Sequence, residues 1–210
     1  MRGDPPATED APGEPSTGEP APPDPRERLL DLLTKRSFRT GEFTLSSGAT
    51  SDYYIDCRTT TMHAEGQALL GEVGWAVLRD LDLDPDAIGG MTMGADPIAY
   101  AVAGESWRRG DPVNAFSVRK QEKGHGTARR IEGCFEPGSR VVLVEDVVTT
   151  GGSALDAARA VEGAGGEILT VLALVDRQEG GREALEEAGH RVVALYTTED
   201  LRRTHAGGGA

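Results

Sequence analysis

The sequence predicts an α/β fold in which a mostly parallel central sheet is flanked by helices. Short apolar runs typical of strands alternate along the chain with longer segments whose apolar residues recur at helical spacing. One run, residues 141–144, is aliphatic throughout, which is typical of a strand buried on both faces of a parallel sheet. A chain of 210 residues also suits one sheet with helices on both faces and right-handed crossovers.

The first 24 residues predict a disordered tail. They are rich in Pro, Glu, Gly and Ala, and eight of the twelve prolines lie within the first 25 positions. We expect a single domain over 25–205 and a flexible C-terminus over 206–210. Within the domain, a helix over 26–35 precedes two strands, 38–45 and 52–58, which form a small N-terminal hood over about 38–60.

The rest of the chain alternates between helix and strand. Strands are expected over 85–91, 113–118, 141–144, 168–175 and 191–197, and helices over 63–79, 98–107, 154–161 and 181–188. Residues 119–133 have no apolar period and predict a long polar loop. In open α/β sheets ligands bind outside the carboxyl ends of the strands, so the loops that follow the strands are the candidates for a site.

Composition excludes several classes of function. The net charge of −13 disfavours a broad nucleic-acid surface, and no stretch reaches the length of a transmembrane helix. The N-terminus lacks the apolar segment of a secretory signal. Cys57 and Cys134 lie far apart without a C-x-x-C motif, which predicts two unpaired thiols in a reducing cytoplasm. We therefore expect a cytoplasmic protein without a nucleic-acid or membrane partner.

The segment after the strand at 141–144 has the composition of a phosphate site. A small turn of Thr149, Thr150, Gly151, Gly152 and Ser153 leads into the helix at 154–161. Glycines let the backbone approach a ligand closely, and free amides at a helix N-terminus attract an anion. This arrangement predicts a cradle for a phosphate group.

Two carboxylates, Glu145 and Asp146, precede this turn and are separated from it by Val147 and Val148. They cannot face a phosphate because like charges repel. They suit the vicinal hydroxyls of a ribose, or a magnesium ion held through water. The segment therefore predicts a ligand with a phosphate at one end and a sugar diol beside it.

The string from 141 to 153, a hydrophobic strand followed by Glu-Asp-Val-Val-Thr-Thr-Gly-Gly-Ser, resembles the phosphoribosyl-diphosphate signature of type I phosphoribosyltransferases. Neither G-x-x-x-x-G-K-[ST] nor G-x-G-x-x-G is present, which disfavours a nucleoside triphosphate loop and a dinucleotide fold. A glycine-rich turn that serves packing alone is the alternative.

The polar loop is the second candidate site. Five of the chain's 22 basic residues lie between 119 and 130: Arg119, Lys120, Lys123, Arg129 and Arg130. Composition leaves open whether the loop is merely solvated or binds an anion such as a departing diphosphate. The order Arg-Lys-x-x-Lys-x-His-Gly, which includes His125, resembles the catalytic loop of orotate phosphoribosyltransferases.

Three further stretches resemble the same family. Residues 43–54 are similar to its hood, in which an aromatic pair, here Tyr53 and Tyr54, flanks the base; an ordinary amphipathic hairpin is the alternative. Residues 90–97 are similar to a loop that contacts diphosphate. Arg177 follows a strand where the family has an arginine that contacts the orotate carboxylate, a task that suits a planar guanidinium. A surface ion pair is the alternative for Arg177.

The resemblance implies transfer of phosphoribosyl from phosphoribosyl diphosphate (PRPP) to N1 of orotate, with Mg²⁺ carried by the diphosphate rather than by a protein site. It implies a homodimer in which the loop at about 119–132 reaches the neighbouring subunit. The implied catalytic residues are Lys123, His125 and Asp146. The implied substrate-binding residues are Tyr53, Tyr54, Arg119, Lys120, Lys123, His125, Glu145, Asp146, Val147, Val148, Thr149, Thr150, Gly151, Gly152, Ser153 and Arg177.

Two positions depart from the family pattern. Many relatives carry a lysine where this chain has Ser46, and an aromatic-lysine pair where it has Met93 and Gly94. The departures predict either a looser diphosphate pocket or a larger share of binding by Arg119 and Lys120. Two other functions stay open: a phosphoribosyltransferase for another base, and a non-enzymatic regulator that senses PRPP.

Overall fold

The computed structural model describes residues 23–44, 48, 50–120 and 130–208. The expected tail therefore lies almost entirely outside the described residues, as does Ser46. Within the described ranges, six strands form one sheet in the order β5-β4-β3-β6-β7-β8. Every neighbouring pair is parallel except β4 and β5, so the prediction of a mostly parallel sheet is confirmed.

Each strand that the sequence predicts for this sheet is present, although the strand predicted at 141–144 extends to residue 148. The strands are β3 (Ala87–Met91), β4 (Asn114–Val118), β5 (Ile131–Gly133), β6 (Arg140–Val148), β7 (Glu167–Asp176) and β8 (Val192–Thr197). The short strand β5 corrects the expectation that 119–133 is loop throughout. It pairs with the end of β4, and the Arg119 amide continues this pairing by donating to the Arg130 carbonyl at 2.8 Å.

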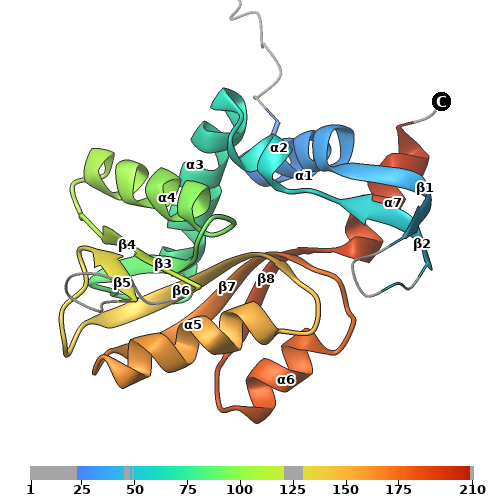
Figure 1. Ribbon diagram of the computed structural model, residues 1–210. Coiled ribbons are helices and arrows are strands. Elements are labelled where there is room, and N and C mark those ends of the chain that lie inside the picture. The colour runs from blue at the N-terminus through green and yellow to red at the C-terminus, as the bar shows by residue number, and fades with distance from the viewer. Residues whose placement is uncertain (1–22, 45–47, 49, 121–129, 209–210) are drawn as a thin grey trace, which may run out of the picture.

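Helices cover both faces of the sheet (Figure 1). On one face lie α3 (Ala64–Asp80) and α4 (Asp96–Arg108), and on the other α5 (Gly152–Gly163) and α6 (Gly181–Glu187). Pro97 stands in the first turn of α4, where its missing N–H costs no helical hydrogen bond. Among the described residues, every helix is too short or too polar to cross a bilayer.

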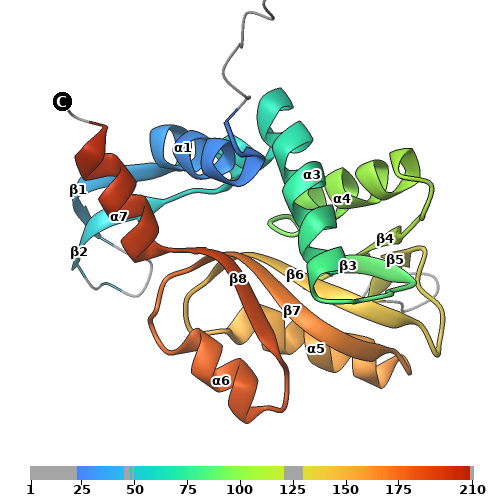
Figure 2. The same ribbon diagram turned by 180° about the vertical axis from the view of Figure 1, so that it is seen from behind.

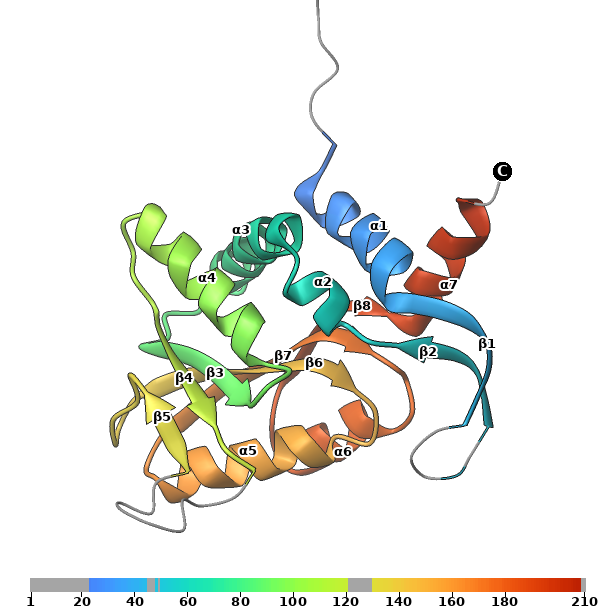
Figure 3. The same cartoon turned by 45° about the horizontal axis from the view of Figure 1, so that its top comes forward.

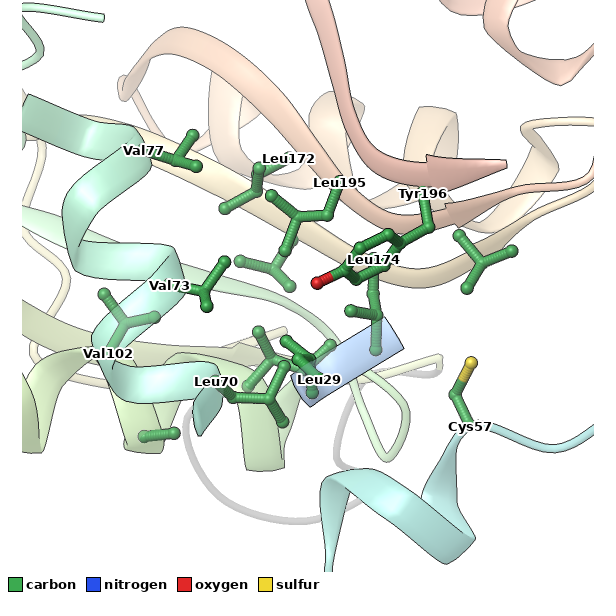
Figure 4. Packing of buried hydrophobic residues seen from close by; sticks show 14 of the residues in the cluster. Leu29, Cys57, Leu70, Val73, Val77, Val102, Leu172, Leu174, Leu195 and Tyr196 are labelled. Atoms are coloured by element: carbon green, nitrogen blue, oxygen red, sulfur yellow. The ribbon is translucent and has the colours of Figure 1, made fainter. Parts of the chain in front are cut away.

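The core lies on both sides of β6. Val142 and Val144 belong to the cluster under α3 and α4, whereas Val141 and Leu143 belong to the cluster under α5. This alternation is why the strand is apolar at every position from 141 to 144. In Figure 4, side chains from α3 gather with Leu172 of β7. Full burial of one such side chain stabilises the fold by about 1.5–3 kcal/mol.

The hood lies beyond the sheet and is built from both ends of the domain (Figure 2). It contains α1 (Pro25–Ser37), the antiparallel pair β1 (Phe38–Thr44) and β2 (Thr50–Ile55), the short helix α2 (Arg58–Thr61) and the last helix, α7 (Thr198–Gly207). The Tyr196 hydroxyl donates to the Arg26 carbonyl at 2.6 Å, and the Arg26 guanidinium donates to the Leu195 carbonyl. The first helix is therefore tied to the end of β8.

Helix α7 was not expected from the sequence. It begins with a capping box, in which the Thr197 side chain accepts the backbone N–H of Asp200 and the Asp200 side chain accepts that of Thr197. The helix runs through Gly207, so it includes the first two residues of the segment expected to be flexible from 206. Figures 2 and 3 both show α7 beside α1 and the hood strands.

The centre of the sheet has a switch point between β3 and β6. From β3 the chain passes through α4 to β4 on one side, and from β6 it passes through α5 to β7 on the other. The connections therefore diverge at the carboxyl ends of two adjacent strands. This divergence opens a crevice, which is the place where α/β sheets bind ligands.

Candidate active site

A cavity of about 590 Å³ opens at this switch point. Its walls come from four places: the end of β2 with the start of α2, the loop after β3, the end of β6 with its loop, and the single residues Lys120 and Arg177. The lining residues are Tyr54, Ile55, Asp56, Cys57, Arg58, Met91, Thr92, Met93, Gly94, Lys120, Glu145, Asp146, Val147, Thr149, Ser153 and Arg177.

A smaller hollow of about 190 Å³ continues the cavity over the start of α5. It is lined by Glu145 and residues 147–154. Glu145, Val147, Thr149 and Ser153 line both spaces. The carboxylate pair and the glycine turn therefore belong to one continuous crevice, as the spacing of the two motifs predicts.

The turn before α5 is shaped by Gly151. Its φ of +78° is left-handed, and a Cβ there would lie 2.8 Å from the Gly181 carbonyl oxygen. Asp24 and Thr197 cap the starts of α1 and α7 with their side chains, whereas no side-chain cap is present at the start of α5 in the described structure. The first amides of α5 are left to a ligand, and their partial positive charge favours an anion.

The carboxylates of Glu145 and Asp146 are half-buried beside one another. Burial is the largest cause that raises the pKa of Glu145, to about 8, and the nearby Asp146 carboxylate adds to it. Burial also raises the pKa of Asp146, although hydrogen bonds from backbone amides oppose the shift. Among the described residues, Glu145 Oε2 is buried without a hydrogen-bond partner. Such an oxygen suits a ligand that brings hydroxyl groups.

Gly94 packs directly against the Asp146 carboxylate. A Cβ at position 94 would lie 2.5 Å from Asp146 Oδ1 and 2.7 Å from its Cγ. Asp146 Oδ1 also accepts the Val147 amide at 3.0 Å. The carboxylate is therefore held between its own backbone and the loop after β3.

Arg58 is a cavity residue that the sequence analysis did not identify. It follows β2, and Asp56 holds its guanidinium through two hydrogen bonds of 2.8 and 2.9 Å. Its positive charge lies close enough to Asp146 to lower the pKa of that carboxyl group. Arg58 thus adds a cation to the wall formed by the hood.

Arg177 lines the cavity from the end of β7, and its side chain is 10% exposed. Its Nε donates to the Tyr53 hydroxyl at 3.1 Å, and its Nη2 lies 2.8 Å from Glu179 Oε1. The Tyr53 hydroxyl donates to the same Glu179 oxygen at 3.2 Å. The guanidinium is therefore fixed in the wall of the cavity before any ligand binds.

Comparisons with known proteins identify the family to which the chain belongs. A family model described as "Phosphoribosyl transferase domain" matches residues 68–189. Orotate phosphoribosyltransferase of Aquifex aeolicus (strain VF5) is 46% identical over 179 residues, which cover 84% of this chain and 97% of that protein. The chain belongs to the orotate phosphoribosyltransferase family.

Solved structures of orotate phosphoribosyltransferases have the same fold. The Mycobacterium tuberculosis H37Rv enzyme in complex with Fe(III) dicitrate superposes with a TM-score of 0.76 at 42% identity, covering 85% of this chain and 99% of that one. The same enzyme in complex with PRPP has a TM-score of 0.72 at 38% identity, with 85% and 99% covered. The predicted α/β fold of a type I phosphoribosyltransferase is thereby confirmed.

The two hood tyrosines of this orotate phosphoribosyltransferase family member lie in different environments. Tyr54 is 41% exposed and lines the cavity, whereas Tyr53 is 8% exposed and supports Arg177 from behind. They differ because successive side chains of a strand point to opposite faces. Of the two rings, Tyr54 is the one that lines the cavity, and the predicted contact of both rings with the base stays a prediction.

The basic residues of the loop at 119–130 also have different surroundings. Lys120 lines the cavity, but Arg119 is 3.1 Å from Glu132, and Arg130 donates to Asp156 at 2.7 Å. These two arginines therefore have partners within the protein at the base of the loop. Lys123, His125 and Arg129 lie outside the described residues, and their predicted roles stay predictions.

The residues of the site fit a magnesium ion that arrives with a substrate. Within the described parts of the chain, no three His, Cys, Asp or Glu side chains converge as a metal site. Glu145 and Asp146 offer two carboxylates beside the phosphate hollow. Mg²⁺ is commonly held in this way, by one or two carboxylates together with the phosphates of a substrate.

Proposed function

We propose that this chain transfers phosphoribosyl from PRPP to N1 of orotate, giving orotidine 5′-monophosphate and diphosphate in the de novo synthesis of UMP. The observation that carries the proposal is the continuous crevice with three chemical zones: an amide-lined hollow, a carboxylate pair and a fixed arginine. Relatives named orotate phosphoribosyltransferase match nearly the whole described domain.

The order of these zones sets the orientation of the substrates. The 5-phosphate of PRPP binds in the hollow formed by residues 149–153, where free amides and hydroxyl groups face it. The ribose hydroxyls donate to Glu145 and Asp146, which supplies the partner that Glu145 Oε2 lacks. Orotate lies between Tyr54 and Arg177, with its carboxylate on the guanidinium.

The chemistry is a displacement at the anomeric carbon. The bond from C1 to the diphosphate oxygen breaks, and its electron pair leaves with diphosphate. N1 of orotate forms the new bond to C1 and loses its proton, which the departing diphosphate accepts. Positive charge that develops on the ribose is stabilised by the carboxylates, and negative charge on the leaving group is stabilised by Lys120 and by the predicted contacts of Lys123 and His125. Mg²⁺, when bound, would be carried by the diphosphate and would offset its charge, and Glu145 and Asp146 would hold the ion through water.

The proposal includes a homodimer in a reducing cytoplasm. Large apolar side chains are exposed at Met93 in the loop after β3 and at Tyr100 and Trp107 on α4. A second copy of the chain would cover this surface, and the family resemblance expects the loop at about 119–132 to cross such an interface. Cys57 and Cys134 are free thiols, which fits a reducing compartment.

A panel of free bases tests the proposal. The purified chain is mixed with PRPP, Mg²⁺ and either orotate, uracil, adenine or hypoxanthine, and the loss of each base is followed by its absorbance. Loss of orotate alone supports the proposal. Consumption of another base instead would indicate a different phosphoribosyltransferase, and PRPP binding without any product would indicate a PRPP-sensing protein.

A further inference from the structure

Helix α7 contacts the support of Arg177. The guanidinium carbon of Arg202, on α7, lies 4.7 Å from the centroid of the Tyr53 ring, and that of Arg177 lies 4.8 Å from the same centroid. One tyrosine ring thus receives two cations, one from the cavity wall and one from the last helix. Contacts of this kind are attractive because the face of an aromatic ring is electron-rich.

Carboxylates balance the two cations. Arg202 Nη2 donates to both oxygens of Asp52, at 2.8 and 2.9 Å, and Arg177 is paired with Glu179 at 2.8 Å. A continuous row of contacts therefore runs from Asp52 on β2 through Arg202, Tyr53 and Arg177 to Glu179. A carboxylate at each end of this row offsets part of the repulsion between the two guanidinium groups.

Helix α7 also contacts Phe38, the aromatic ring that stacks on Tyr53. His205 meets the edge of Phe38 at 5.6 Å between centroids, and Phe38 stacks on Tyr53 at 5.7 Å. Tyr53 is consequently fixed by two residues of α7, one directly and one through Phe38. Because the Tyr53 hydroxyl accepts the Arg177 Nε–H, a fixed ring means a fixed guanidinium.

We infer that Arg202 is a positioning residue for Arg177 and thereby raises the affinity of the site for the carboxylate of the base. This inference rests on the proposed function, in which Arg177 binds that carboxylate. Arg202 does not line the cavity described above, so its effect passes through Tyr53. The last helix thus contributes to the choice of a base that bears a carboxylate.

The test compares Arg202→Ala with Arg202→Lys and with Arg203→Ala. Arg202→Ala should raise the Michaelis constant for orotate about three- to tenfold while that for PRPP stays within error. Arg202→Lys keeps a cation over the ring and should restore most of the affinity. Arg203 is the matched control, since it is a neighbouring arginine of the same helix that pairs with Asp200.

Three outcomes would overturn the inference: unchanged kinetics in Arg202→Ala, an equal rise in both Michaelis constants, or the same effect in Arg203→Ala. A melting curve for each variant shows whether α7 has simply unfolded, and such unfolding should alter both substrates alike. The decisive measurement is therefore whether the Michaelis constant for orotate rises while that for PRPP does not.

A second measurement keeps the inference separate from the proposed function. The Arg177 Nε–H should give a slowly exchanging signal in nitrogen-resolved NMR of the ligand-free protein, because it is hydrogen-bonded to Tyr53. Arg202→Ala should speed its exchange. If the wild-type chain fails to consume orotate, the proposed function fails, and this signal alone decides the inference: unchanged exchange in Arg202→Ala would refute it.

Discussion

Gly94 sets the position of the Asp146 carboxylate. The family resemblance predicts a lysine at this position, but here the Asp146 carboxylate occupies the space that a side chain would need. A Cβ at this position would lie 2.5 Å from Asp146 Oδ1, so any side chain would displace the carboxylate. Gly94, which has no side chain, therefore leaves the space that the Asp146 carboxylate occupies.

Gly94→Ala should raise the Michaelis constant for PRPP about tenfold or more, because a displaced carboxylate no longer meets the ribose hydroxyls. Steady-state kinetics with each substrate varied in turn measure this. Gly104→Ala on α4 is the control, since its Cβ would contact only the end of the Arg108 side chain at 4.0 Å. A normal PRPP constant in Gly94→Ala would contradict the argument.

Glu145 should make the stability of the ligand-free protein depend on pH. Its pKa is about 8 in the folded protein and 4.5 in the unfolded chain, so between these values the folded state keeps a proton that the unfolded state has lost. The free energy of unfolding should therefore fall as pH rises from 4.5 to 8, by up to about 1.4 kcal/mol per pH unit from this group.

Melting temperatures between pH 5 and 9 check this prediction. Glu145→Gln, which cannot ionise, should melt with a shallower dependence on pH and should be more stable than the wild type at pH 8. Glu187→Gln, at an exposed position on α6, serves as the control. Parallel curves for the wild type and Glu145→Gln would show that the carboxyl group is not buried as described.

Single residues also show where sequence reasoning reaches its limit. Glu145, Asp146 and the turn 149–153 could be located because strand, acid pair and turn are contiguous in the chain. Arg58 could not, since its role depends on the hood folding over the switch point. The spacing of Tyr53 and Tyr54 did contain the missed signal, because adjacent residues of a strand face opposite sides.

At the scale of elements, the start of α5 depends on Gly151. Gly151→Ala should destabilise the protein by about 1–3 kcal/mol, because a residue with a Cβ is strained at a φ of +78° and would also meet the Gly181 carbonyl. The distorted turn should lose PRPP affinity as well. Thermal unfolding and PRPP titration measure the two effects.

Gly163→Ala, near the end of the same helix, is the matched variant. Its Cβ would meet open space, so it should leave PRPP affinity unchanged and melt at least as high as the wild type. If the two alanine variants bind PRPP equally well, the hollow over α5 is not the phosphate site.

The elements missed from the sequence are those whose apolar pattern is weak. Helix α7 reads Thr-Glu-Asp-Leu-Arg-Arg-Thr-His-Ala-Gly and has only two buried residues among those described, Thr198 and Leu201. Its capping box was the available signal. Strand β5 has three residues and depends on pairing with β4, which no local pattern reveals. The longer elements were predicted because their apolar faces are wide.

At the scale of the whole molecule, the exposed side chains of α4 predict self-association. Trp107 is 75% exposed and Tyr100 is 52% exposed, and they lie two turns apart on one helix. Sedimentation at micromolar concentration should show a dimer. Trp107→Glu should shift it toward the monomer, whereas Trp107→Phe should not. A monomeric wild type would contradict the proposed assembly.

The fold as a whole was predictable because alternating strands and helices leave few topologies. The location of the crevice was also predictable, since parallel strands bring their carboxyl ends to one edge of the sheet. The sequence pattern could not reveal which oppositely charged group each charged side chain contacts. Arg119, for example, pairs with Glu132 across the β4–β5 junction, and its predicted contact with the ligand stays a prediction.

The central claim is that one crevice holds PRPP at the carboxylates and the α5 turn, and the carboxylate of the base at Arg177. Arg177→Ala tests it most directly, with Arg191→Ala at an exposed position as the control. We expect the Michaelis constant for orotate to rise about 10- to 100-fold, with the constant for PRPP unchanged. An equal rise in both constants, or no change in either, would contradict the account.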